Sequence, residues 1–246
     1  MRIFRQISFF VLIFLAASCG SGDGKRSNFR LGIDPNWYPL DFGALQPYVN
    51  GFTEDLLLEI SQYAGVDFVK IESNWDSLLE GLQSQKYDAV LTSFPDYHFN
   101  KAKYEFSQNF LDLGPVLVVP SNAKFHDLSK LSNEVVGVVV GDSSLLILQK
   151  YPEIIVRKYE TTPALLEALA TGSLEGALLD RLDALTFIKD MYKQQLKIST
   201  APLTTFGLHM VSLKGQQERL MQTFERALKE LKKQKKLQAL QDKWQI

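Results

Sequence analysis

Hydroxyl groups follow a short apolar run of the sequence, at a position suited to binding a polar ligand. Thr92 and Ser93 come directly after residues 89–91, Ala-Val-Leu, within the stretch from Lys86 to Ser107. An apolar run of this length predicts a buried strand, and ligands of open α/β sheets bind beyond the carboxyl ends of strands. Thr92 and Ser93 are therefore candidate ligand-binding residues. The simpler alternative is that they cap the turn that follows.

The same arrangement occurs again 87 residues later. Residues 78–91 read LLEGLQSQKYDAVL, and residues 165–178 read LLEALATGSLEGAL. Each segment has the pattern of an amphipathic helix, a polar turn and a short apolar strand. The offset places Asp180 where the first copy has Ser93. Two similar α/β lobes that face each other across a cleft are the simplest arrangement that explains this repeat.

A third polar group follows the strand predicted over residues 135–140. The sequence Gly141-Asp142-Ser143-Ser144 precedes an apolar segment over residues 145–148. A glycine turn with hydroxyls at a helix start can bind an anion through free backbone N–H groups. Capping of the helix by Asp142 or Ser143 is the alternative, and both can hold at once.

Aromatic residues also lie at predicted junctions. A strand over residues 29–33 ends at Asp34, and the prolines at 35 and 39 predict an irregular loop that contains Trp37. Trp75 lies at another strand-to-helix junction, before the helix of the first repeat, which Asn74 or Ser73 is expected to cap. Both indoles could pack on a core or line a cleft. Thr53 is the predicted N-cap of the helix between these two segments.

Composition and charge limit the possible classes of function. The chain has 246 residues, 46% hydrophobic and 22% charged, and a formal net charge of −1. This balance gives no support for nucleic-acid binding, which needs a basic surface. His98, His126 and His209 are dispersed and the chain has one cysteine, so we expect no metal site and no cofactor. No hydrolase motif of the HExxH or GxSxG type occurs, and we do not expect an enzyme.

The N-terminus has the pattern of an export signal. Arg2 and Arg5 precede an apolar segment over residues 9–17, which is too short to span a bilayer. We predict a signal peptide over residues 1–18 and, over residues 19–28, a lipid-modified Cys19 with a flexible tether. Residues 15–19, Leu-Ala-Ala-Ser-Cys, resemble a bacterial lipobox. A plain signal peptide with an incidental cysteine is the alternative.

The order and spacing of several stretches resemble one known family. These stretches are LGIDPNWYPLDF, GFTEDLLLEI, NWDSLLEGLQSQKYDAVLTS, KYEFS with GPVLVV, VGVVVGDSS, LEGALLD and the final DKW. Together they resemble the family 3 extracellular solute-binding proteins of ABC transporters, the polar-amino-acid group. The resemblance implies an α/β, two-lobe, periplasmic-binding-protein-like (type II) fold with two crossover strands, expected near residues 115–119 and 203–206. Lobe 1 would comprise residues 29–116 and 204–246, and lobe 2 residues 117–203.

The resemblance also implies roles for the candidate residues. Asp34, Trp37 and Trp75 match contacts to a ligand side chain, and Thr92, Ser93 and Ser143 match contacts to its carboxylate. Asp180 matches the acid that binds the ligand ammonium.

Asn100 stands where the family has an arginine for the α-carboxylate, and it is the eighth candidate ligand-binding residue. Lys101 or Lys103 could supply the missing charge. With Asp34, Asp142 and Asp180 at strand ends near the expected cleft, the ligand should carry positive charge, as in a basic amino acid, a short peptide or an amine.

The expected function is that of a monomeric, lipid-anchored binding protein outside the cytoplasm. It would deliver a small molecule to ABC permease subunits. The alternatives are an enzyme on the same fold, dehydratase-like, with Asp142 or Asp180 as acid, and a ligand-sensing adaptor.

Overall fold

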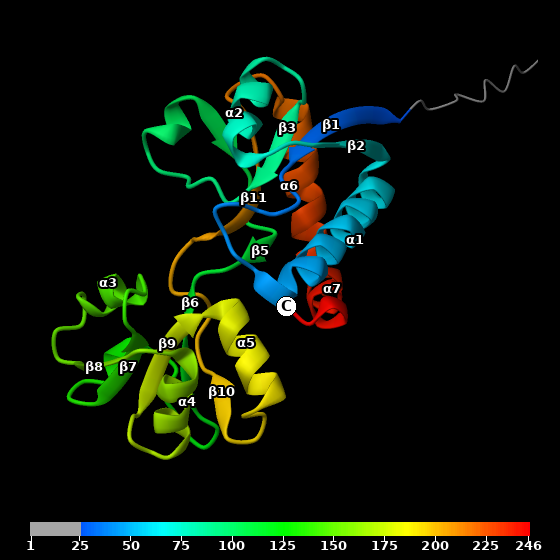
Figure 1. Cartoon of the computed structure of the whole chain (residues 1–246). Helices are drawn as coiled ribbons and strands as arrows, with labels where there is room; N and C mark the ends of the chain where they lie inside the picture. Colours follow the sequence, from blue (N-terminus) through cyan, green and yellow to red (C-terminus); the bar gives the residue numbers. More distant parts are fainter. Residues whose placement is uncertain (1–25) are drawn as a thin grey trace, which may run out of the picture.

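A computed structural model describes residues 26–246 of the protein as two α/β lobes joined by two chain segments (Figure 1). The strands divide into two separate sheets, which confirms the predicted two-lobe fold. The predicted signal peptide and Cys19 lie outside the described residues.

Lobe 1 is built on a mixed sheet. The strand order is β2-β1-β3-β11-β4, and β5 also pairs with β11. Its strands are β1 (Ser27–Ile33), β2 (Val66–Glu72), β3 (Ala89–Thr92), β4 (Tyr104–Phe106), β5 (Leu111–Asp112) and β11 (Gly207–Leu213). Its helices are α1 (Gln46–Ala64), α2 (Trp75–Gln83), α6 (Glu218–Lys233) and α7 (Lys236–Trp244). Because β1 and β3 are parallel, their carboxyl ends lie at the same edge of the sheet, and Figure 1 shows β3 pointing toward lobe 2.

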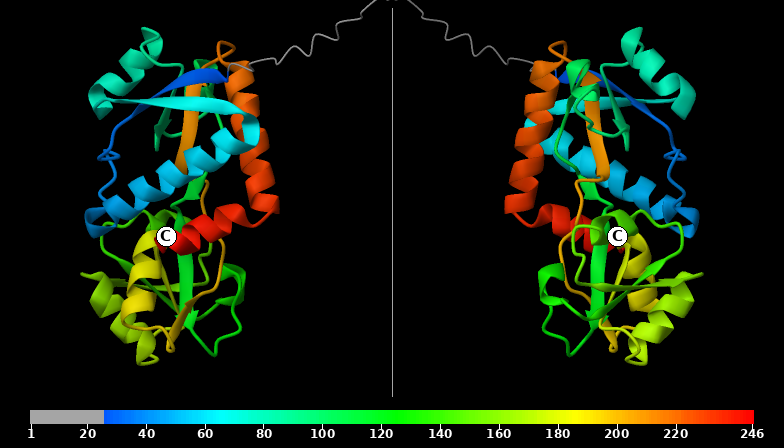
Figure 2. Two further views of the ribbon diagram at one scale, coloured as in Figure 1. Left: turned by 90° about the vertical axis from the view of Figure 1, so that its right-hand side faces the viewer. Right: turned by 90° about the vertical axis from the view of Figure 1, so that its left-hand side faces the viewer.

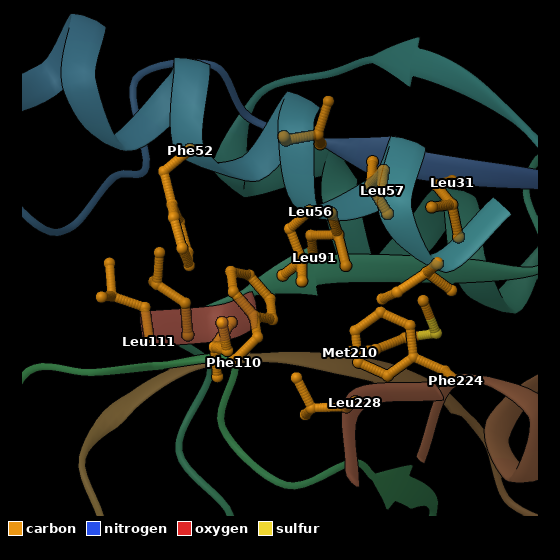
Figure 3. Packing of buried hydrophobic residues seen from close by; sticks show 14 of the residues in the cluster. Leu31, Phe52, Leu56, Leu57, Leu91, Phe110, Leu111, Met210, Phe224 and Leu228 are labelled. Carbon is orange, nitrogen blue, oxygen red and sulfur yellow. The ribbon is translucent and has the colours of Figure 1, made fainter. Parts of the chain in front are cut away.

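The core of lobe 1 lies where α1 and α6 meet the sheet (Figure 3). Phe52 and Leu56 of α1 pack in one cluster with Leu91 of β3 and with Phe224 and Leu228 of α6. These side chains are at most 1% exposed. Their burial holds β3, and therefore the residues that follow it, in a fixed position.

The start of α1 differs from the prediction. The helix begins at Gln46, with a proline in its first turn, where a missing N–H costs no hydrogen bond. Thr53 was the predicted N-cap, but it lies inside the helix, and its hydroxyl donates to the Val49 carbonyl at 2.8 Å. That prediction is wrong because Val49 and Phe52 face the core and extend the helix by almost two turns toward the N-terminus.

Lobe 2 has a five-stranded sheet of order β10-β6-β9-β7-β8. Its strands are β6 (Pro115–Pro120), β7 (Val135–Val139), β8 (Ile155–Tyr159), β9 (Gly176–Asp180) and β10 (Leu196–Ile198). Its helices are α3 (Ser144–Leu148), α4 (Thr162–Ala170) and α5 (Arg181–Asp190). The predicted repeat is present, because α4 and β9 begin 87 residues after α2 and β3. Asn74 caps α2 as predicted, by accepting from the N–H of Ser77.

Two adjacent segments connect the lobes. Residues 113–114 lead from β5 to β6, and residues 199–206 lead from β10 to β11. The N–H groups of Leu113 and Gly114 donate to the Phe206 carbonyl at 2.9 and 3.2 Å, so the segments lie side by side. The crossing strand expected over residues 115–119 forms β6, which belongs entirely to the lobe 2 sheet, and residues 203–206 form no strand.

The N-terminal edge of lobe 1 begins earlier than expected. Ser27 and Asn28, assigned from the sequence to the tether, belong to β1, where they pair with Val66 and Asp67 of β2. Pairing with β2 extends the strand toward the N-terminus beyond its apolar part.

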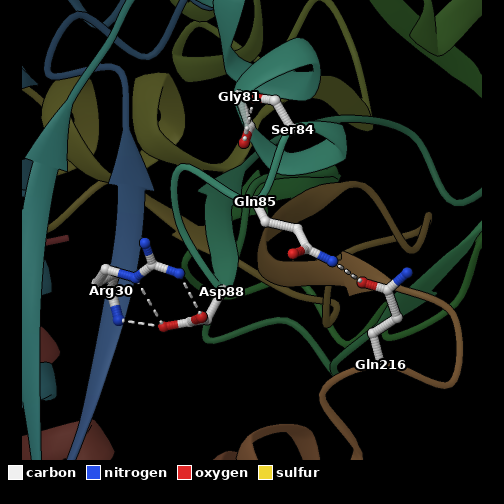
Figure 4. Close-up of polar contacts among 6 residues, drawn as sticks. All are labelled: Arg30, Gly81, Ser84, Gln85, Asp88 and Gln216. Carbon is white, nitrogen blue, oxygen red and sulfur yellow. Dashed lines mark hydrogen bonds and ion pairs between the residues drawn. The ribbon is translucent and has the colours of Figure 1, made fainter.

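A carboxylate ties β3 to β1 (Figure 4). Asp88, which precedes β3, accepts the backbone N–H of Arg30 at 2.7 Å and its guanidinium at 3.0 and 3.4 Å. The N–H of Asp88 donates back to the Arg30 carbonyl at 2.8 Å. These four contacts fix the register in which Leu31 faces Ala89.

Helix α5 belongs to lobe 2 and also touches lobe 1. Leu182, 6% exposed, joins the core cluster of lobe 1, whereas Ala184 packs in lobe 2. Lys189 near the end of α5 contacts the side chain of Gln245, and the side views place the C-terminus close to this helix (Figure 2). Asp180 and α5 are therefore positioned by both lobes.

Candidate functional site

A cavity of about 440 Å³ lies between the two lobes, next to the crossing segments. Lobe 1 contributes residues from the loop after β3, and lobe 2 contributes α3 and the end of β9. Three of the eight predicted site residues line this cavity: Ser93, Ser143 and Asp180. The other lining residues are Pro95, Asp96, Tyr97, Pro115, Leu146, Ile147, Lys150, Thr204, Thr205, Phe206, Gly207 and His209.

Ser93 and Asp180 reach the cavity because Ser93 follows β3 and Asp180 ends β9, the two buried strands of the repeat. All four residues of β3 are buried, and so are the first four of β9. Such strands occupy the centre of their sheets and carry the chain to the sheet edge, where it turns. Ser93 is 5% exposed and Asp180 is exposed on the cavity side. The spacing in sequence thus brings the two polar groups to one cavity.

Among the carboxylates of residues 26–246, Asp180 has the most strongly raised pKa. Partial burial raises its pKa, and repulsion from the carboxylates of Asp142 and Asp183 raises it further, to about 6. Although part of its surface meets solvent, the surrounding protein replaces much of its hydration. A cation bound beside Asp180 would relieve both effects.

Ser143 reaches the cavity from the glycine turn that the sequence predicted. Gly141 has a φ of +83°, a conformation that side chains rarely adopt. Asp142 accepts the N–H of Ser144 at 2.6 Å, so Asp142 is the residue that caps this turn. The hydroxyl of Ser143 makes no capping hydrogen bond and is exposed. It is therefore free to contact a ligand.

Asp34 and Trp37 do not face the cavity. Asp34 is 5% exposed and accepts the N–H of Asn36 at 2.9 Å, which closes its own turn. Trp37 is 2% exposed, has a φ of +57°, and donates its indole N–H to Asn50 at 2.6 Å. Its ring belongs to the lobe 1 core. Packing on the core was one of the two alternatives that the sequence allowed for Trp37, and the structure shows this packing.

The remaining candidates lie on lobe 1 beside the cavity but do not line it. Thr92 is buried and accepts the N–H of Phe94 at 3.1 Å, the turn-capping role that was its alternative. Trp75 is half-buried, and its ring lies 6.3 Å from that of Tyr38 and 6.4 Å from that of Phe94. Asn100 donates its amide to the Pro95 carbonyl at 2.8 Å and holds the loop after β3.

His209 is a cavity residue that sequence reasoning did not find. Its Nε2 lies 2.8 Å from the Phe94 carbonyl, and its Nδ1 lies 3.1 Å from the Asn109 Oδ1. Asn109 in turn donates to Asp112 and to the carbonyl of Thr205. Burial lowers the pKa of His209. Through Asn109, His209 connects the loop after β3 with β5 and with the crossing segment that contains Thr205, which only the folded chain brings together.

A larger cavity of about 630 Å³ shares Asp96, Thr204, Thr205 and His209 with this one. It lies against β4, β5 and α6 and contains none of the predicted site residues. We therefore take the smaller cavity as the candidate ligand site. Within residues 26–246 no group of three or more His, Cys, Asp or Glu side chains could hold a metal ion. No helix in the same range is long and apolar enough to cross a membrane.

Comparison with known families and curated proteins gives consistent matches. Residues 29–246 match the model of the bacterial extracellular solute-binding proteins, family 3. The chain is 25% identical over 223 residues to the L-cystine-binding protein TcyJ of Escherichia coli K12, covering 89% of this chain and 83% of that one. It is 23% identical over 244 residues to a probable ABC transporter arginine-binding protein of Chlamydia trachomatis, covering 95% of each.

Solved structures share the fold. The unliganded open form of the L-cystine solute receptor of Neisseria gonorrhoeae has a TM-score of 0.68 at 17% identity, with 89% and 93% of the two chains covered. An ancestral cyclohexadienyl dehydratase has a TM-score of 0.67 at 19% identity, with 89% and 92% covered. At these identities both likenesses concern the fold alone.

Proposed function

Because the chain belongs to the bacterial extracellular solute-binding proteins of family 3, we propose that it binds an α-amino acid between its lobes for an ABC importer. The observation that carries this proposal is the cavity itself. Ser93 from one lobe and Ser143 and Asp180 from the other line the same space. These groups suit a ligand with both acceptors and an ammonium group.

Asp180 is the proposed partner of the ligand ammonium. It lines the cavity and has no side-chain hydrogen bond or ion pair within residues 26–246. Asp142 and Asp183 are close enough to raise its pKa. A second positive charge on the ligand would therefore also be favourable, which supports a basic amino acid. Relatives named for cystine and for arginine make these two amino acids the first candidates.

The expectation of a cationic ligand is supported by carboxylates of lobe 2 alone. It was derived in part from Asp34, whose carboxylate closes its own turn away from the cavity. The acids that support it are Asp142, Asp180 and Asp183, all in lobe 2.

Calorimetry with the purified protein tests this function. The panel contains L-arginine, L-lysine, L-histidine, L-cystine, L-glutamine, L-glutamate and the amine agmatine. We expect an α-amino acid with positive or zero net charge to bind most tightly. Binding of L-glutamate alone, or of no amino acid, would contradict the proposal. Conversion of a panel compound into a product would favour the dehydratase alternative.

The N-terminal sequence supports a proposal about location. We infer that Cys19, after residues 15–18, carries a lipid that anchors the protein on the outer side of a membrane, beside its permease. Cys19→Ser should release the protein into the soluble fraction without detergent. Retention of the Cys19→Ser protein in washed membranes would exclude the anchor.

A further inference from the structure

The charged groups that line the interlobe cavity are few. In the part of the chain that the structure describes, they are Asp96, Lys150 and Asp180, together with the titratable His209. Asp96 pairs with Lys101 at 2.7 Å. Lys150 and Asp180 have no ion pair or side-chain hydrogen bond within residues 26–246. The cavity therefore offers one unpaired cation and one unpaired anion to a ligand.

Lys150 lies in the turn that directly follows α3 and lines the cavity. Ser143, Leu146, Ile147 and Lys150 all line the cavity, and they are spaced i, i+3, i+4 and i+7, which is one face of a helix. Leu148 is 2% exposed and packs in the core of lobe 2. The N–H of Lys150 donates to the Ile147 carbonyl at 3.1 Å, so the turn continues through it. Lys150 and Ser143 therefore line the same cavity from the two ends of α3.

The other cations near the site are already engaged. Lys101 holds Asp96 and does not line this cavity. Arg181 points its guanidinium at the Asp112 carbonyl, 3.5 Å away, in the crossing region. Asn100 is neutral and uses its amide within its own loop.

We propose that Lys150 binds the carboxylate of the amino acid whose ammonium is bound by Asp180. This inference rests on the proposed function, since an amino acid is the ligand that brings both charges. Lobe 2 then recognises both ends of the zwitterion, and lobe 1 closes over it with Ser93. A ligand without a carboxylate leaves Lys150 unpaired and binds less tightly.

Calorimetry on a lysine variant tests the role of Lys150. The ligands are the panel amino acid that binds most tightly and its carboxamide, which keeps the ammonium and side chain but lacks the carboxylate. Lys150→Met removes the charge and retains most of the aliphatic stem. We expect the amino acid to bind about tenfold more weakly or worse. The affinity for the carboxamide should change by less than about twofold, because the carboxamide has no carboxylate with which Lys150 could form an ion pair.

Two further variants complete the experiment. Lys150→Arg keeps the charge and should retain most of the affinity. Lys158→Met removes an exposed lysine of β8 that does not line the cavity and should have no effect.

An equal loss for both ligands, or no loss in Lys150→Met, would overturn the role of Lys150. In the first case Lys150 acts through another group, such as Asp96 on the opposite lobe. The titration of the wild-type protein tests the proposed function independently of the variants. If the wild-type protein binds no amino acid, the proposed function itself is wrong.

Discussion

Asp180 combines two properties that a binding carboxylate needs. It is the last residue of the otherwise buried strand β9, which fixes its backbone, and it lines the cavity. Its pKa of about 6 lies above its usual range, because burial and two neighbouring acids disfavour the charged form. Since this shift favours the protonated folded state, the stability that it contributes is lost as the pH rises through about 6. Above that pH the empty site holds a carboxylate that a bound ammonium would stabilise.

Ligand affinity should therefore depend on pH in a defined direction. Pairing with an ammonium lowers the pKa of Asp180, so at pH values below about 6 the free protein must lose a proton before it can bind. We expect affinity to be constant from pH 7 to 8 and to fall by up to about tenfold per pH unit below 6. Calorimetry at pH 5 and pH 8 measures the difference. Asp180→Asn should bind weakly and lose the dependence, whereas equal wild-type affinities at both pH values would refute the assignment.

The three candidate residues that line the cavity occupy similar places in the chain. Ser93 and Ser143 come after the ends of β3 and β7, Asp180 ends β9, and ligands of α/β sheets bind beyond such strand ends. Asp34 also follows a strand, but its carboxylate accepts the N–H of Asn36 and does not line the cavity. Trp37, in the same loop, packs in the core of lobe 1. Whether a polar or aromatic side chain after a strand faces the cavity, its own turn or the core depends on local backbone geometry, which the sequence pattern does not specify.

At the scale of elements, β3 determines where the loop after it enters the cavity. Its position depends on the contacts of Asp88 with Arg30 of β1. The Asp88 side chain is 17% exposed, so these contacts are better shielded from water than most surface ion pairs.

Asp88→Ala should destabilise lobe 1 markedly. It removes the acceptor of the Arg30 N–H together with the partner of the guanidinium. We expect a loss of about 1–3 kcal/mol, measured as a lower urea midpoint at unchanged slope. Asp67→Ala is the matched control, because it removes only the exposed ion pair with Arg26. Its effect should stay within about 0.5 kcal/mol. Similar losses in both variants would mean that the backbone contact of Asp88 contributes little.

The helices and strands of the repeat were predicted from their strong periodicity, whereas the face of α3 that lines the cavity was not predicted. The repeat predicted α2 with β3 and α4 with β9 at the same offset. The apolar run over residues 145–148 predicted a helix, but because all four residues are apolar it did not indicate which side of the helix lines the cavity. Counting i+3, i+4 and i+7 from Ser143 identifies Leu146, Ile147 and Lys150, so the signal for Lys150 was present in the sequence. The signal for His209 was absent, since its two partners, Phe94 and Asn109, come from separate segments far from it in the sequence.

At the scale of the whole molecule, we expect the lobes to move relative to each other about the two crossing segments. They pair with each other over only a few residues, and they border the cavity. Tyr97 of lobe 1 and Leu146 of lobe 2 line the cavity and are 58% and 63% exposed. Closure that buries these side chains gains roughly 25 cal/mol for each Å² of apolar surface removed from water. A ligand that binds better to the closed form shifts the equilibrium toward it.

Small-angle X-ray scattering tests most directly whether the lobes close over an amino acid held at Asp180. The protein is measured without ligand and with the tightest panel amino acid at a concentration that saturates it by calorimetry. We predict that the radius of gyration decreases on binding, and that Asp180→Ala shows no decrease at the same concentration. An unchanged scattering profile of the saturated wild-type protein would contradict the account.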